Sequence, residues 1–85
     1  DVDAAFAAIR ERGLARILCE GGPHLFGALL AADAVDELCI TVEPSLEADD
    51  ARRIATGELP DPRGMLLEHV LRSGSTVLLR YRRAR

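Results

Sequence analysis

The chain has 85 residues and a formal net charge of −3 at pH 7, and 48% of its residues are hydrophobic. This is the composition of one small folded domain, or of part of a larger one, and it excludes an intrinsically disordered chain. No apolar run approaches the roughly 18 residues of a membrane span. No signal-peptide pattern opens the chain and no basic stripe is interleaved with aromatic residues, so we expect neither membrane nor nucleic-acid partners.

The ends and the cysteines of the chain give two further expectations. Because the first residue is Asp1 and not methionine, we expect a processed chain or a fragment. Cys19 and Cys39 lie in apolar strand-like runs and lack C-x-x-C spacing. We therefore expect buried free thiols, no metal site and a cytoplasmic location.

The first third of the chain predicts helix, strand and helix. Residues 2–12 place Val2, Phe6 and Ile9 on one apolar stripe, and Gly13 is a typical helix stop. The apolar run at 14–19 predicts a buried strand, and residues 25–32 predict a short helix.

The remainder of the chain predicts three more strands, over residues 36–43, 65–71 and 76–82. A long polar connection, 45–62, follows the first of them, and Ser73-Gly74-Ser75 predicts a hairpin turn between the last two. The strand-helix-strand order at 14–43 favours a parallel strand pair. The expected fold is therefore a mixed α/β sheet that ends in an antiparallel hairpin.

The whole pattern is organised around Glu20-Gly21-Gly22-Pro23-His24, which joins the first expected strand to the second helix. Glycines allow the backbone to approach an anion closely, and the first amides of a helix present N–H groups and a partial positive charge. Pro23 suits a first helical turn. The turn therefore predicts phosphate binding, although the full G-x-G-x-x-G spacing is absent and Gly-Gly also serves simple turn geometry.

Several polar residues have two interpretations. Glu20 either binds a polar ligand at this turn or caps the helix that follows. His24 is a ligand or an exposed first-turn residue, and no second His or Cys stands at metal spacing. The C-terminal arginines form either a phosphate clamp or a solvated edge: Arg80, Arg82, Arg83 and Arg85. The strand period favours the solvated edge, because it places only Arg80 and Arg82 on one face and leaves the others near a frayed end.

The combined motif resembles a known family. It comprises residues 18–23, Leu25-Phe26-Gly27-Ala28-Leu29-Leu30, residues 35–38, and the C-terminal runs 67–71 and 79–83. Together these are similar to the C-terminal reductase domain of bacterial riboflavin biosynthesis, the family of 5-amino-6-(5-phosphoribosylamino)uracil reductases with a dihydrofolate-reductase-like fold. The resemblance covers essentially all of residues 1–85, which correspond to the C-terminal part of one such domain.

The resemblance implies NADPH-dependent reduction of a ribosylamino-pyrimidine phosphate to its ribitylamino form. It places the cofactor at Gly21, Gly22, Pro23 and His24, and gives Glu20 the role of orienting substrate or nicotinamide ribose. The family often has threonine or serine at position 24, where this chain has His24, and the acidic residues at 46–50 differ from its usual loop. These departures leave open the substrate and the presence of a preceding deaminase domain.

Two other functions remain as alternatives. One is a reductase of the same fold that acts on a dihydrofolate-like pterin, and the other is a truncated, non-catalytic folding or dimerisation module. An open sheet side or hairpin edge favours pairing with another chain. We therefore expect a homodimer.

Overall fold

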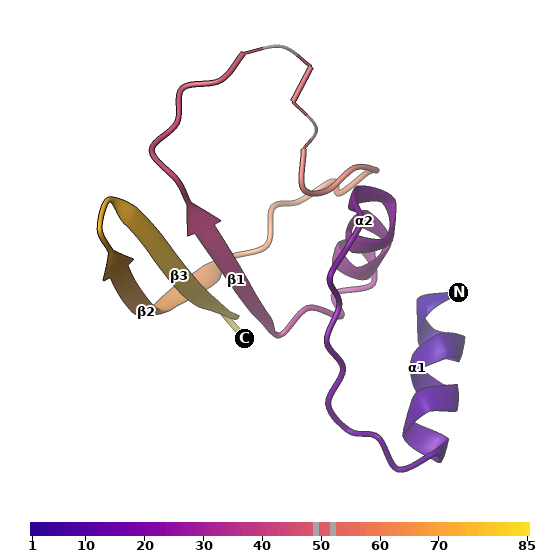
Figure 1. Cartoon of the computed structure of the whole chain (residues 1–85). Helices are drawn as coiled ribbons and strands as arrows, with labels where there is room; N and C mark the ends of the chain where they lie inside the picture. The colour runs from indigo at the N-terminus through magenta and orange to yellow at the C-terminus, as the bar shows by residue number, and fades with distance from the viewer. Residues whose placement is uncertain (49, 52) are drawn as a thin grey trace. The chain divides into compact units, whose positions relative to one another are not determined.

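The computed structural model describes residues 1–48, 50–51 and 53–85. The chain forms two compact units, one of Asp1–Ala34 with Arg52–Leu59 and the other of Val35–Ala51 with Pro60–Arg85. The first contains the helices and the second contains the sheet (Figure 1).

Helix α1, Val2–Glu11, confirms the first predicted helix. The side chain of Asp1 caps it by accepting a hydrogen bond from the Ala4 N–H at 3.1 Å. The helix ends at Arg12, and Gly13 follows with φ +79°, the left-handed conformation that glycine adopts most readily. The predicted stop at Gly13 is therefore confirmed.

Helix α2, Pro23–Ala31, confirms the second predicted helix and begins two residues earlier than expected. Gly22 is its N-cap and Pro23 its first residue, where a missing N–H costs no helical hydrogen bond. Leu29 is 7% exposed and is the one buried hydrophobic side chain among the described residues.

The buried strand predicted at residues 14–19 is not observed. None of these residues takes part in the strand pairing of the described chain, and all of them are exposed, Leu18 by 83%. A strand exists only where a neighbour pairs with its backbone N–H and C=O groups. The described residues supply no such neighbour, so the predicted parallel strand pair is also wrong.

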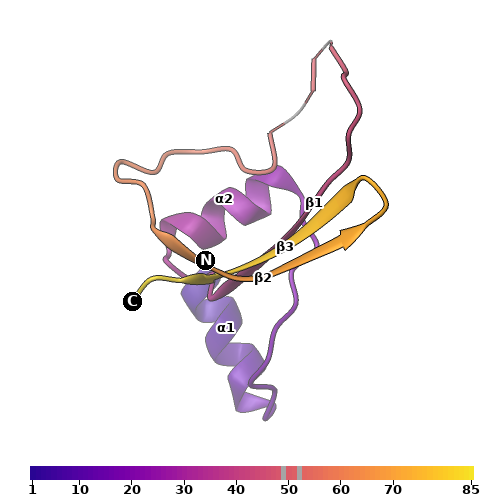
Figure 2. The same ribbon diagram turned by 90° about the vertical axis from the view of Figure 1, so that its left-hand side faces the viewer.

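The three strands of the second unit confirm the other strand predictions. They are β1 (Glu37–Val42), β2 (Met65–Ser73) and β3 (Thr76–Arg83). The sheet has the order β1-β3-β2, and both strand pairs are antiparallel (Figure 2). Gly74 has φ +60° in the two-residue turn between β2 and β3, as the predicted hairpin requires.

The strand register gives the sheet an apolar and a polar face. Cross-strand pairs such as Ile40 with Leu79 lie on one face, and Cys39 with Arg80 on the other. Between Leu67 and His69 the register shifts, which leaves Glu68 as the extra residue of a β-bulge. The bulge brings the Glu68 carboxylate to the polar face.

The predicted burial of the cysteines is wrong, whereas their free state is confirmed. Cys19 and Cys39 are both free and both exposed. Cys19 lies in the unpaired segment, and Cys39 lies on the polar face of β1. No helix in the described part of the chain is long and apolar enough to cross a membrane.

Candidate functional site

The turn that joins the extended segment 14–20 to α2 holds the five predicted site residues in succession. Gly21 has φ +104°, a conformation that L side chains rarely adopt, and the Gly21–Gly22 peptide bond is cis. Gly22 is extended, with φ −90° and ψ −160°. The backbone of this turn therefore requires glycine at position 21 and permits other residues at position 22.

The space around the two glycines is open. Among the described residues, no heavy atom lies within 4 Å of a Cβ built on Gly21 or Gly22, chain neighbours aside. The backbone N–H groups of His24 and Leu25 have no acceptor among the described residues, and the first turn of α2 carries no acidic side chain. Unpaired amides at a helix start attract an anion. The turn therefore has the chemistry to bind a phosphate.

Glu20 stands immediately before this turn and is exposed. The alternative role of helix cap is not observed, because Gly22 is the N-cap of α2 and no side chain hydrogen-bonds to that end. Within the described chain the Glu20 carboxylate has no hydrogen-bonding partner. It is available to accept hydrogen bonds from a ligand at the turn.

His24 has a partner that the sequence did not indicate. Its Nδ1 lies 3.0 Å from the hydroxyl oxygen of Thr56, and the Thr56 N–H donates to the Pro23 carbonyl oxygen at 3.1 Å. Thr56 follows α2 by more than twenty residues and lies in the polar connection, where neither periodicity nor motif distinguishes it. The imidazole therefore engages a neighbour through Nδ1 and leaves Nε2 for other contacts.

Comparison with protein families decides the classification. The family described as "RibD C-terminal domain" matches residues 1–79. The chain belongs to this family. The family resemblance drawn from the sequence is confirmed, and with it the mixed α/β fold of the dihydrofolate-reductase type. A search of curated proteins found no match.

As a RibD C-terminal domain, the chain is a reductase-type domain of riboflavin biosynthesis. No group of three or more His, Cys, Asp or Glu side chains that could hold a metal ion occurs among the described residues. The predicted site residues are thus adjacent in the RibD-type domain, on one turn.

The C-terminal arginines of the RibD-type domain have partners within the sheet unit. The Glu68 carboxylate pairs with Arg82 Nε at 2.6 Å and with Arg80 Nη2 at 3.3 Å. Arg83 Nη1 donates to the Gly64 carbonyl oxygen at 2.7 Å, and Arg85 pairs with Asp36 at 3.2 Å. Arginines engaged in this way favour the solvated-edge interpretation over a phosphate clamp.

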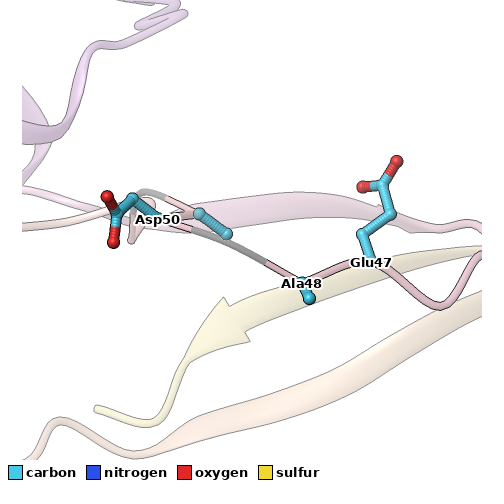
Figure 3. A pocket seen from close by; sticks show the side chains of 4 residues that line it. Glu47, Ala48 and Asp50 are labelled. Carbon is cyan, nitrogen blue, oxygen red and sulfur yellow. The ribbon is translucent and has the colours of Figure 1, made fainter.

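A shallow hollow in the connection between β1 and β2 is lined by Glu47, Ala48, Asp50 and Ala51. The Glu47 and Asp50 side chains extend from separate points of this stretch and point in different directions (Figure 3). Two carboxylates repel a phosphate, so this hollow offers no second anion site. Asp49, part of the same acidic run in the sequence, lies outside the described residues.

Proposed function

We propose that this RibD C-terminal domain takes part in the NADPH-dependent reduction of 5-amino-6-(5-phosphoribosylamino)uracil to its ribitylamino form. The observation that carries the proposal is an open glycine turn with unpaired helix amides in a domain of this family. In this proposal the nicotinamide supplies a hydride to C1 of the sugar. The residues of the chain bind and orient the reactants.

The cofactor phosphates are assigned to residues 21–24. Gly21 and Gly22 leave space for a phosphate to approach the backbone. Pro23 starts the helix whose His24 and Leu25 amides have no acceptor among the described residues. The His24 ring adds Nε2 as a further donor or acceptor at the same turn. These features support binding of an anionic dinucleotide.

Glu20 is assigned to orientation of the substrate or the nicotinamide ribose. Its carboxylate is exposed, one residue before the turn, and can accept hydrogen bonds from hydroxyl groups. Correct orientation of two reactants lowers a barrier by several kcal/mol, up to about 7–11 in well-oriented systems. The role needs no proton transfer by Glu20.

To test the binding site, the chain and its Gly21→Val variant are each titrated with NADPH. Nicotinamide fluorescence reports the binding. Saturable binding that the substitution abolishes supports the glycine turn as the cofactor site. Equal affinity in the two folded proteins contradicts it. Absence of binding by the folded parent chain leaves two possibilities, a non-catalytic module or one part of a cofactor cleft.

Glu20→Gln tests the orienting role. In a preparation that turns over substrate, we expect turnover to fall by roughly tenfold or more, because a neutral amide is a weaker acceptor, while NADPH affinity changes little. Steady-state kinetics and the titration together measure both. Unchanged turnover assigns Glu20 a structural role. A parallel assay with dihydropterin distinguishes the pyrimidine substrate from the pterin alternative.

A second copy of the chain is the partner that we propose for the sheet unit. Strand β2 is an edge strand, and four of its apolar side chains are 45–59% exposed: Leu66, Leu67, Val70 and Leu71. An exposed apolar edge strand is a ready surface for pairing. We expect a homodimer by size exclusion with light scattering at micromolar concentration. A stable monomer contradicts this expectation.

A further inference from the structure

The segment of residues 53–59, which we call the strap, is fixed to α2 through one residue. Thr56 makes a backbone hydrogen bond to Pro23 and a side-chain hydrogen bond to His24, at 3.1 and 3.0 Å. Both partners belong to the first turn of α2, and the strap runs beside this helix in both views (Figures 1 and 2). The strap and α2 also belong to the same compact unit.

Gly27 is the third residue of α2 that the strap approaches closely, after Pro23 and His24. A Cβ added to Gly27 would overlap the Thr56 carbonyl oxygen and would lie 2.8 Å from the carbonyl carbon. The clashing atoms belong to the backbone, so rotation of a side chain cannot relieve the overlap. Gly27 has ordinary helical geometry, and a glycine inside a helix is otherwise unfavourable. Its place in α2 is thus explained by the close approach of the strap.

We propose that Gly27 and Thr56 form a docking point that holds the strap on α2 and fixes the orientation of the His24 ring. Hydrogen bonds from one residue to both the backbone and the ring restrain the imidazole more than either does alone. Thr56 is therefore a positioning residue. The proposal does not depend on the cofactor assignment, because it concerns contacts within the ligand-free chain.

The experiment is amide hydrogen exchange, measured by NMR on the chain without nucleotide. In Gly27→Ala we expect the Thr56 amide to exchange at least about fivefold faster, the ratio that corresponds to loss of one typical hydrogen bond. The Ala32 amide, which follows α2 as its C-cap and donates to the Ala28 carbonyl oxygen, should keep its protection and report that the helix is intact. Unchanged exchange at Thr56 with α2 intact overturns the proposal.

Gly64→Ala is the matched control, because a Cβ at that position would meet only the Ala84 Cβ at 3.7 Å, an ordinary contact. It should leave the Thr56 exchange rate unchanged. A Thr56 amide that accelerates in Gly64→Ala as much as in Gly27→Ala overturns the proposal, since the effect would then not be specific to the docking point.

A second pair of variants keeps the sequence of α2 intact. Thr56→Val removes the hydroxyl, whereas Thr56→Ser retains it. We expect the His24 ring nitrogen signals, read in a long-range ¹⁵N–¹H spectrum, to shift in Thr56→Val and to stay in place in Thr56→Ser. Ring signals that are unchanged in Thr56→Val overturn the positioning role, even where Gly27→Ala fails to fold.

Discussion

The glycine pair Gly21-Gly22 and the single glycine Gly27 lie close in the sequence of the helical unit and differ in what surrounds them. At Gly21 and Gly22 a Cβ would enter open space, whereas at Gly27 it would overlap the backbone of Thr56. The first pair precedes α2, whereas Gly27 lies within the helix and against the backbone of Thr56. The same residue type thus leaves room for a ligand at one position and for the chain itself at the other.

Because of this difference, we expect substitutions at the turn and at Gly27 to act through different physical causes. At the open turn, an added Cβ meets no atom of the described residues beyond its chain neighbours, so the cost of substitution arises from backbone conformation and from exclusion of a ligand. At Gly27, the added side chain meets a carbonyl group, so its cost arises without any ligand. Measurements of stability and of nucleotide affinity on the same variants therefore distinguish the two positions.

Gly21→Val is expected to have the largest effect. Gly21 has φ +104°, where a β-branched residue is strongly disfavoured, so we expect a loss of about 1–3 kcal/mol in the free energy of unfolding. NADPH affinity should fall further than this strain explains, because the side chain occupies the open space at the turn. Urea unfolding and the fluorescence titration measure the two quantities. A loss of stability with unchanged NADPH affinity would show that NADPH does not bind at this turn.

Gly27→Ala is expected to have the next largest effect, and its sign is informative. Helix propensity alone predicts stabilisation by about 1 kcal/mol, because alanine is the better helix former. Overlap with the Thr56 carbonyl predicts destabilisation by about 1–3 kcal/mol. We expect the second term to exceed the first and the urea midpoint to fall. A rise in the midpoint would show that the strap does not dock at Gly27.

The elements of the fold were largely predictable from local pattern, and the pairing of one segment was not. Residues 14–19 form a largely apolar run and residues 37–42 alternate apolar with more polar positions, and both have strand length. The second pairs with β3 over its whole length, and the first pairs with no described strand. Periodicity reports that a segment can be a strand, whereas hydrogen-bonding partners decide whether it is one.

The candidate site likewise has one part that the local sequence indicates and one part that depends on a contact between distant residues. The turn at residues 20–24 was indicated by glycine, proline and helix-start chemistry that lie next to one another in the sequence. The contact of His24 with Thr56 joins residues 32 positions apart, and a threonine in a polar connection carries no signal of it. The signal that could have shown part of this contact is Gly27, because glycine is unfavourable within a helix and can indicate close approach of another group. It could not identify which group approaches.

Gly22→Ala is expected to have the smallest effect on stability and gives the sharpest test of the open turn. Gly22 has φ −90°, which alanine adopts without strain, and its Cβ would meet no protein atom. We expect a loss below about 1 kcal/mol, the size of the N-cap preference for glycine over alanine.

If a phosphate approaches this backbone, the added methyl group still lowers NADPH affinity by roughly tenfold, or about 1.4 kcal/mol. Isothermal titration of Gly22→Ala beside Gly64→Ala, whose position lies outside the turn, measures this effect against a matched glycine substitution. Loss of affinity only in Gly22→Ala places the ligand at the turn, because neither variant disturbs the fold. Equal affinities would mean that the open space at Gly22 is simply solvent, and only Gly27 would then need glycine for close approach.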